Sequence, residues 1–242
     1  MVHSALALCK RSTQSTATNQ GVTRYNANNG VLTKQRIHMQ TLRLGKEDFS
    51  PSKIICIGRN YAAHAAELGN AIPDEMVVFL KPNSSIGNTL ASSFDGETLH
   101  FEAEICFLLR AGKISAVAVG LDLTRRETQN RLKDKGLPWE RCKAFNGAAI
   151  FSEFVPFSGD VASLHLELDI NGEAAQRGGV PMMLFPPAHM LQELPTFLTL
   201  EDGDVVMTGT PEGVGPVAAG DVFEARLFSG DELLSSERWQ AQ

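Results

Sequence analysis

Apolar and polar residues alternate along several short stretches of this chain, a pattern that predicts a protein built mainly from β-strands. Residues 39–44 and 164–170 show the period of two expected of a half-buried strand, and Asn171-Gly172 after the second stretch predicts a hairpin. Short, continuously apolar stretches between turn residues predict fully buried strands. The strands are expected at residues 39–44, 53–58, 77–81, 101–109, 117–123, 164–170, 204–208 and 222–228, with a turn at 229–231.

Helix-favouring sequence is confined to three short segments. The first is Ala-rich, follows Asn60 as a candidate N-cap, and precedes Gly69, which is placed to end it. The second follows Thr124 and has Glu127 three residues later, the pattern of a capping box. The helices are expected at residues 61–68, 125–135 and 187–198, so the predicted fold class is mostly β with short helices (α+β).

Residues 1–38 differ from the remainder because they contain five Lys or Arg residues and no Asp or Glu. We interpret them as a disordered leader outside the folded domain, which comprises residues 39–242. A basic, acid-poor segment rich in Ser and Thr resembles an organelle transit peptide. The alternative that we favour is a translation start assigned too early, with Met39 as the true start.

Charge and cysteine content narrow the class of protein. A formal net charge of -6 and a pI near 5.5 disfavour a broad surface for nucleic acid or anionic lipid. The four cysteines are widely separated, which disfavours a zinc site or a disulfide-rich domain and is typical of a reducing compartment. No apolar run approaches the roughly 20 residues of a membrane span. We therefore expect a cytoplasmic protein, with organelle targeting by residues 1–38 as the alternative.

Two carboxylates lie close together within a predicted buried strand. In a strand of period two, Glu102 and Glu104 point to the same face. Two buried like charges are costly unless they are protonated or bound to a cation. Oxygen ligands alone favour a hard metal such as Mg²⁺, Mn²⁺ or Ca²⁺ over zinc. The alternative is an edge strand whose glutamates face water.

A third carboxylate, Asp122, stands in the middle of another apolar stretch, where an unpaired Asp is uncommon. It could cap the helix that follows, but Thr124 is itself a good candidate for that cap. We therefore consider Asp122 available to a metal site together with Glu102 and Glu104, and helix capping remains the alternative.

His64 and Glu67 stand three residues apart in a predicted helix and so share one face. A carboxylate that orients an imidazole and raises its basicity gives a general base, which could activate water. Histidine and glutamate with this spacing are also common on exposed helices, so this pair alone does not identify an active site.

Several further groups could bind an anionic substrate. Lys81 and Lys143 interrupt apolar sequence, where a buried ammonium needs an anionic partner, although either side chain could instead extend to solvent. The glycine- and proline-rich residues 208–216 follow an apolar strand and could present backbone N–H groups to a carboxylate. A tight connection between strands is the alternative for this loop.

Seven motifs, taken together and in order, resemble the fumarylacetoacetate hydrolase family, in particular its small single-domain branch of acylpyruvate hydrolases and oxaloacetate decarboxylases. They extend over nearly all of residues 53–222. The motifs are Gly58-Arg59-Asn60-Tyr61-Ala62-Ala63-His64, Lys81-Pro82, Phe101-Glu102-Ala103-Glu104, Leu121-Asp122-Leu123-Thr124, Gly136-Leu137-Pro138-Trp139, Lys143-Ala144-Phe145 and Gly209-Thr210-Pro211-Glu212-Gly213-Val214-Gly215-Pro216.

The resemblance implies a mixed β-roll that forms a homodimer, and it implies a role for each motif residue. Mg²⁺ or Mn²⁺ would be bound by Glu102, Glu104 and Asp122. His64 and Glu67 would activate water on a mobile lid, and Lys143 would stabilise an enolate. The residues expected around the substrate are Arg59, Tyr61, Lys81, Gln176 and Thr210.

The resemblance also implies metal-dependent cleavage of a C–C bond in a small 2-keto acid. Hydrolysis of a 3-acylpyruvate to pyruvate and a carboxylate, decarboxylation of oxaloacetate, or both are expected. One alternative is an isomerase or decarboxylase of a 2-hydroxy-dienedioate, and another is a non-catalytic protein that binds keto acids. Asn146, Cys142 and Glu127 depart from residues common in the family, which leaves the substrate open.

Overall fold

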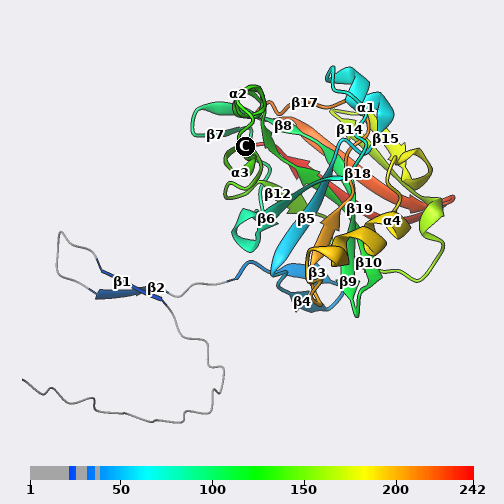
Figure 1. Ribbon diagram of the computed structural model, residues 1–242, viewed down its shortest axis with the longest axis horizontal. Helices are drawn as coiled ribbons and strands as arrows, with labels where there is room; N and C mark the ends of the chain where they lie inside the picture. Colours follow the sequence, from blue (N-terminus) through cyan, green and yellow to red (C-terminus); the bar gives the residue numbers. More distant parts are fainter. Residues whose placement is uncertain (1–21, 26–31, 36–38) are drawn as a thin grey trace, which may run out of the picture. The chain divides into compact units, whose positions relative to one another are not determined.

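The computed structural model describes residues 22–25, 32–35 and 39–242 (Figure 1). The chain divides into two compact units, Met1–His38 and Met39–Gln242. In the first unit, β1 (Val22–Tyr25) pairs antiparallel with β2 (Leu32–Gln35). The prediction of a disordered leader or a misassigned start falls mostly on residues outside this description, and it stays a prediction.

A seven-stranded mixed sheet forms the centre of the second unit (Figure 1). Its strand order is β12-β10-β9-β16-β5-β6, with β13 also paired to β10. Only the β16–β5 pair is parallel among the pairings of this sheet. The strands are β5 (Lys53–Gly58), β6 (Val77–Pro82), β9 (Ala103–Arg110), β10 (Lys113–Asp122), β12 (Ala149–Phe151), β13 (Val155–Pro156) and β16 (Val205–Met207).

The central strands are apolar throughout because both faces of this sheet are buried. Alternate residues of β9 separate into two hydrophobic clusters, with Ile105 and Phe107 in the larger and Cys106 and Leu108 in the smaller. A strand covered on both faces loses the alternation of apolar and polar residues. This explains why residues 53–58 and 117–123 read as continuous apolar stretches in the sequence.

The second large sheet is antiparallel, with the order β15-β14-β18-β19, and has one buried face. Leu164, Leu166 and Leu168 of β14 are fully buried, whereas the residues between them are partly exposed. Asn171 and Gly172, both with positive φ, connect β14 to β15 as the predicted hairpin. The strands are β14 (Leu164–Ile170), β15 (Glu173–Gly179), β18 (Val222–Ser229) and β19 (Glu232–Gln240).

Smaller sheets and short helices complete the unit. Strand β8 lies between β11 and β17 and also pairs with β7, and β3 pairs with β4. These strands are β3 (Leu42–Leu44), β4 (Glu47–Phe49), β7 (Ser93–Phe94), β8 (Glu97–Phe101), β11 (Thr124–Arg125) and β17 (Gly215–Pro216). The helices are α1 (Ala62–Glu67), α2 (Arg126–Asp134), α3 (Glu140–Lys143) and α4 (Pro187–Glu193), with 3₁₀ turns η1 (Asn83–Ser85), η2 (Val161–Ser163), η3 (Val180–Met182) and η4 (Leu194–Thr196).

The predicted fold class, mostly β with short helices, is confirmed, but several boundaries differ. The single strand expected at 101–109 is broken at Glu102, because β8 and β9 pair with different neighbours. Strand β19 and helix α3 were not predicted, since neither segment has a clear apolar period. No helix of the described residues is long and apolar enough to span a membrane.

Both predicted N-caps are wrong. The side chain of Asn60 does not cap α1; its amide instead donates to the carbonyls of Thr208 and Phe185 at 2.8 and 3.1 Å. Asn60 therefore holds the chain before α1 against distant segments. Helix α2 begins after Arg125, which makes no capping bond, and Thr124 belongs to β11.

We expect an ion-pair network on the exposed side of the second sheet to make the stability of the protein depend on pH. Hydrogen bonds from Arg226 and Arg177 hold the pKa of Asp169 below its usual value. A lowered carboxyl pKa contributes stability above the ordinary pKa and loses it as the pH falls. Asp169→Asn should therefore lower the free energy of unfolding at pH 7 by about 1 kcal/mol, with the difference from the wild type disappearing at acidic pH.

Urea unfolding at pH 7 and below pH 4 would measure this difference, with Asp231→Asn in an exposed turn as the control. A stability loss that is equal at both pH values would contradict the proposed contribution of the Asp169 charge.

Candidate metal centre and active site

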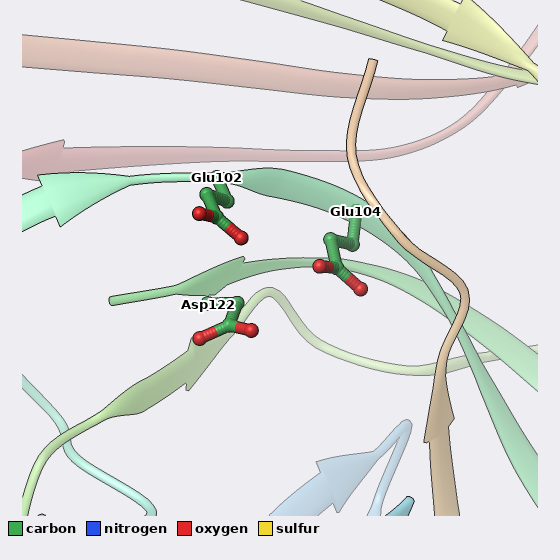
Figure 2. A group of neighbouring side chains, drawn as sticks. All are labelled: Glu102, Glu104 and Asp122. Atoms are coloured by element: carbon green, nitrogen blue, oxygen red, sulfur yellow. The ribbon is translucent and has the colours of Figure 1, made fainter. Parts of the chain in front are cut away.

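Three carboxylates meet where two strands of the central sheet end. Glu102 lies at the break between β8 and β9, Glu104 lies in β9, and Asp122 is the last residue of β10. The backbone N–H of Asp122 donates to the carbonyl of Glu102 at 2.8 Å, and this hydrogen bond holds the end of β10 beside the start of β9. One oxygen from each of the three side chains lies within 4.8 Å of the others. Figure 2 shows all three carboxylates directed into the same space.

The loop that follows β16 contributes directly to this cluster. Gly209 donates its N–H to Oε2 of Glu104 at 2.7 Å. Its φ of +95° lies in the left-handed region, and a Cβ at this position would come within 2.8 Å of the carbonyl oxygen of Ile57. Glycine is therefore required for the backbone to approach Glu104 this closely.

Glu102 is buried but compensated by two cations. Nζ of Lys143 lies 2.8 Å from Oε2 of Glu102, and Arg126 pairs with the other oxygen. Although burial favours the neutral acid, Lys143 and then Arg126 hold the pKa of Glu102 well below its usual range. Burial likewise opposes the charge of Lys143, but Asp122 and Glu102 outweigh it and raise the pKa of the ammonium.

Glu104 has no such cationic partner among the residues that the structure describes. It is 2% exposed, and the Gly209 N–H is its sole hydrogen-bond donor there. Burial first, and then repulsion from Asp122 and Glu102, raise the pKa of Glu104 well above its usual value. A positive charge at this position is thus the element that the buried cluster lacks.

The donor atoms fit a hard divalent cation. Among the described residues, Oδ1 of Asp122 accepts no hydrogen bond, although it forms an ion pair with Nζ of Lys81 at 2.8 Å. Oε1 of Glu104 also accepts no hydrogen bond there. Buried carboxylate oxygens that lack donors, with no sulfur or nitrogen ligand between them, match the preference of Mg²⁺ and Mn²⁺. The three residues predicted as metal ligands are therefore together and could bind such an ion.

His64 and Glu67 form the predicted pair on α1. Nδ1 of His64 lies 3.1 Å from Oε2 of Glu67, and Oε1 of Glu67 accepts the N–H of Gly213 at 3.0 Å. The carboxylate can only accept a hydrogen, so it selects the Nδ1–H form and leaves Nε2 as the basic nitrogen. Gly213 has a φ of +98°, and a Cβ there would meet the carbonyl oxygen of Ala175 at 2.1 Å. The glycine-rich loop thus anchors this helix through Glu67.

A pocket with about 460 Å³ of empty space, including its open mouth, connects these groups. The predicted site residues that line the pocket are Arg59, His64, Glu102, Glu104, Asp122, Lys143 and Thr210.

Three residues predicted to contact substrate lie outside this lining. Lys81 is fully buried, donates to the carbonyls of Lys143 and Ala148, and lies beside Asp122. Tyr61 is 1% exposed, and burial followed by repulsion from Glu104 raises the pKa of its hydroxyl. Gln176 accepts the N–H of Ala103 at 2.9 Å and donates to the hydroxyl of Thr210 at 2.8 Å. These side chains support the wall of the pocket from behind.

Sequence reasoning missed three pocket residues on α2. Arg126, Gln129 and Lys133 follow the helical spacing of one face and all line the pocket. A signal was present, because a cation in the first turn of a helix opposes the helix dipole. The position of Arg126 therefore indicated a role outside the helix, and its pairing with Glu102 supplies that role. Thr124 was also misinterpreted, because its hydroxyl binds Nζ of Lys143 at 2.6 Å.

Comparisons with known proteins identify the family of this chain. Oxaloacetate tautomerase YcgM of Escherichia coli (strain K12) is 38% identical over 205 residues, which cover 78% of this chain and 93% of that protein. A mitochondrial oxaloacetate decarboxylase of Dictyostelium discoideum is 35% identical over 196 residues, which cover 74% and 90%.

A solved structure, fumarylpyruvate hydrolase from Pseudomonas aeruginosa in complex with Mn²⁺ and pyruvate, superimposes with a TM-score of 0.74. It is 31% identical and covers 84% of this chain and 95% of its own. The family model described as fumarylacetoacetate (FAA) hydrolase C-terminal matches residues 53–235. The predicted resemblance is thereby confirmed, and this chain belongs to the fumarylacetoacetate hydrolase family.

Proposed function

We propose that this protein is a Mg²⁺- or Mn²⁺-dependent enzyme that forms the enolate of a small 2-keto acid, with oxaloacetate as the first candidate substrate. The observation that carries this proposal is the arrangement of one pocket, which is lined by His64 of α1 and by three clustered carboxylates, of which Glu104 has no cationic partner among the described residues. The relatives are named as a tautomerase, a decarboxylase and a hydrolase. An enolate is common to all three reactions, although tautomerisation was not predicted from the sequence.

Glu102, Glu104 and Asp122 would bind the metal ion, because their oxygens cluster in the pocket, and the Mn²⁺ in the Pseudomonas aeruginosa structure supports the use of a divalent metal. A bound divalent cation would act as a Lewis acid that stabilises negative charge on the keto oxygen of the substrate. Lys81, enclosed behind Asp122, and Lys143, between Asp122 and Glu102, would keep these carboxylates in position.

His64 would move the proton. In tautomerisation, its Nε2 would remove a proton from C3 of oxaloacetate, and the electrons of that C–H bond would pass to the keto oxygen. Return of the proton to that oxygen gives the enol, and the reverse path gives the ketone. Glu67 would hold the imidazole in the required form and stabilise its positive charge during the transfer.

Lys143 would stabilise the enolate through its charge. Its ammonium already contacts Glu102, Asp122 and Thr124 at 2.6–2.9 Å, which uses all three of its hydrogens. A direct hydrogen bond to the substrate would require the loss of one of these contacts. Of the proposed substrate contacts, Arg59 and Thr210 would act directly, whereas Tyr61, Lys81 and Gln176 would act by supporting the pocket.

Hydrolysis of a 3-acylpyruvate is the second candidate, favoured by the Pseudomonas aeruginosa hydrolase. The same base would then deprotonate water for attack on the distal carbonyl, and cleavage would release pyruvate. Decarboxylation of oxaloacetate forms the enolate by loss of CO₂ and needs no attacking water. The dienedioate isomerase and the non-catalytic keto-acid binder remain alternatives that product analysis would separate.

Assembly and location remain proposals. The homodimer is still a prediction from family resemblance. The name of the Dictyostelium discoideum relative places that protein in mitochondria, which keeps organelle targeting as the alternative to the cytoplasmic location that we expect.

The first expected result is metal-dependent conversion of enol-oxaloacetate to its keto form. Enol absorbance should decay faster with protein and Mg²⁺ or Mn²⁺ than without protein, and EDTA should abolish the difference. Pyruvate release from oxaloacetate and from acetylpyruvate, measured in parallel, would reveal decarboxylation and hydrolysis. If EDTA left the rates of all three reactions with protein unchanged, the proposed function would be excluded.

We expect Glu104→Gln to lose metal binding while the fold is retained. The amide keeps an oxygen that can accept the Gly209 N–H, and it removes a buried charge that lacks a cationic partner among the described residues. The melting temperature without metal should stay within a few degrees of that of the wild type, whereas its rise on addition of Mn²⁺ should disappear. Glu140→Gln, at an exposed position in α3, is the control. An undiminished Mn²⁺-induced rise in the Glu104 variant would remove this residue from the metal site.

His64→Ala should reduce acylpyruvate hydrolysis and tautomerisation by roughly 10²- to 10⁴-fold, the usual contribution of a general base. It should reduce oxaloacetate decarboxylation less, because loss of CO₂ requires no proton abstraction. Initial rates on the same preparations, loaded with Mg²⁺, would compare the three activities. Equal losses in all of them would contradict this division.

A further inference from the structure

Positive charge gathers where the pocket opens, away from the three carboxylates. Arg59, which precedes α1, and Lys133, in the last turn of α2, both line the pocket. Lys133 also lines an adjoining hollow together with Glu67 and Arg126. Arg59 and Lys133 are partly exposed, in contrast to the buried cations around Glu102, and this exposure places them toward the mouth of the pocket.

These two cations differ from the inner ones because no carboxylate compensates them. Arg126 and Lys143 pair with Glu102, and Lys81 pairs with Asp122. Across residues 39–242, neither Arg59 nor Lys133 has a carboxylate within 4.0 Å of its nitrogens. The mouth of the pocket thus has unpaired positive charge that faces the space for a ligand.

Local structure holds both cations in place. Nζ of Lys133 donates to the side-chain oxygen of Asn70 at 2.7 Å, a neutral partner just beyond the end of α1. The guanidinium of Arg59 lies 6.0 Å from the ring centroid of Trp139, and the Arg59 backbone adopts a φ of +56°, rare for a residue other than glycine. Backbone strain of this kind concentrates at functional sites. Arg59 lies just before α1, and Asn70, which accepts the hydrogen bond of Lys133, lies just after it. A ligand bound by Arg59 and Lys133 would therefore link α2 to both ends of α1.

The charge of Arg59 disfavours the charge of Lys133. Burial first, and then repulsion from Arg59 and Arg126, lowers the pKa of Lys133. An anion between Arg59 and Lys133 would relieve this repulsion, whereas an apolar acyl tail would leave it in place. The arrangement therefore favours a substrate with negative charge at the end away from the keto acid.

We infer that Arg59 and Lys133 bind the second carboxylate of a dianionic 2-keto acid and so determine its selection over monoanionic keto acids. The inference rests on the proposed function for the orientation of the substrate, with its 2-keto acid group at the carboxylate cluster and its far end at the mouth. It assigns specificity to a residue of α2, Lys133, that no family motif in this sequence includes.

A matched pair of ligands tests this inference: oxaloacetate, and its 4-methyl ester, in which the second carboxylate is masked and the 2-keto acid is unchanged. The variants are Lys133→Gln, which removes the charge, Lys133→Arg, which restores it, and Lys135→Gln as the control. Lys135 is an exposed lysine at the end of the same helix and does not line the pocket. For each protein, kcat/KM for tautomerisation and the dissociation constant by calorimetry with Mg²⁺ are measured for both ligands.

The wild type should prefer oxaloacetate to the ester. Lys133→Gln should weaken binding and kcat/KM for oxaloacetate by roughly tenfold, the usual loss for one charge-assisted hydrogen bond. The values for the ester should stay within about twofold, Lys133→Arg should recover most of the preference, and Lys135→Gln should resemble the wild type. Equal losses for both ligands in Lys133→Gln would overturn the inference and limit Lys133 to holding α1 through Asn70.

Failure of the proposed function gives a different result. If neither compound is turned over by the wild type, oxaloacetate chemistry is excluded, yet the calorimetric comparison still decides the role of Lys133. Preference for the diacid that depends on the Lys133 charge would support the inference. Absence of that preference in the wild type, or its persistence in Lys133→Gln, would overturn it.

Discussion

The structure depends on placing three carboxylates in its interior next to cations that compensate only part of their charge. Glu102 and Asp122 have ion-pair partners, whereas among the described residues Glu104 has only a backbone N–H. Buried ion pairs contribute little net stability, since desolvation offsets most of their attraction. The cluster therefore stabilises the fold little by itself, and a bound cation, as in the proposed function, would compensate the charge of Glu104. The central sheet meets this requirement by ending two of its strands at the same place, where backbone pairing fixes the carboxylates before any ion arrives.

The loop after β16 connects this centre to the helix that bears the base. The N–H of Gly209 binds Glu104, and the N–H of Gly213, four residues later, binds Glu67. Both glycines adopt a positive φ in places where a Cβ would meet backbone atoms. One short, rigid segment therefore sets the position of a candidate metal ligand and of the carboxylate that orients His64. The mobile lid expected at α1 from family resemblance stays a prediction, in which a displacement of the helix would break the Gly213 contact and leave the Gly209 contact in place.

Much of the fold and the whole carboxylate cluster could be predicted from the sequence, because both follow from local period and from motif. Two-residue alternation identified β14 and its hairpin, and the Glu102 and Glu104 spacing indicated a shared face. The predictions that failed concern side chains whose hydrogen-bond partners come from distant parts of the chain. Thr124 and Asn60 look like helix caps in sequence, but their side chains bind Lys143 and the distant carbonyl of Thr208 instead. Likewise, no local pattern shows that Lys81 is enclosed behind Asp122, since that depends on the pairing of β6 with β5.

The pocket has an inner group of cations beside the carboxylates and an outer group, Arg59 and Lys133, at its mouth. This division explains how a reaction common to many 2-keto acids could be combined with selection of one substrate. The inner cations are buried and paired with protein carboxylates, so their contribution is the same for every 2-keto acid that enters. Arg59 and Lys133 are partly exposed and have no carboxylate partner within residues 39–242, so their contribution depends on what the far end of the substrate carries. Because α2 supplies Arg126 to the inner group and Lys133 to the outer one, two turns of a single helix span both. A substitution at position 133 would therefore change selectivity while the geometry of the carboxylate cluster is preserved.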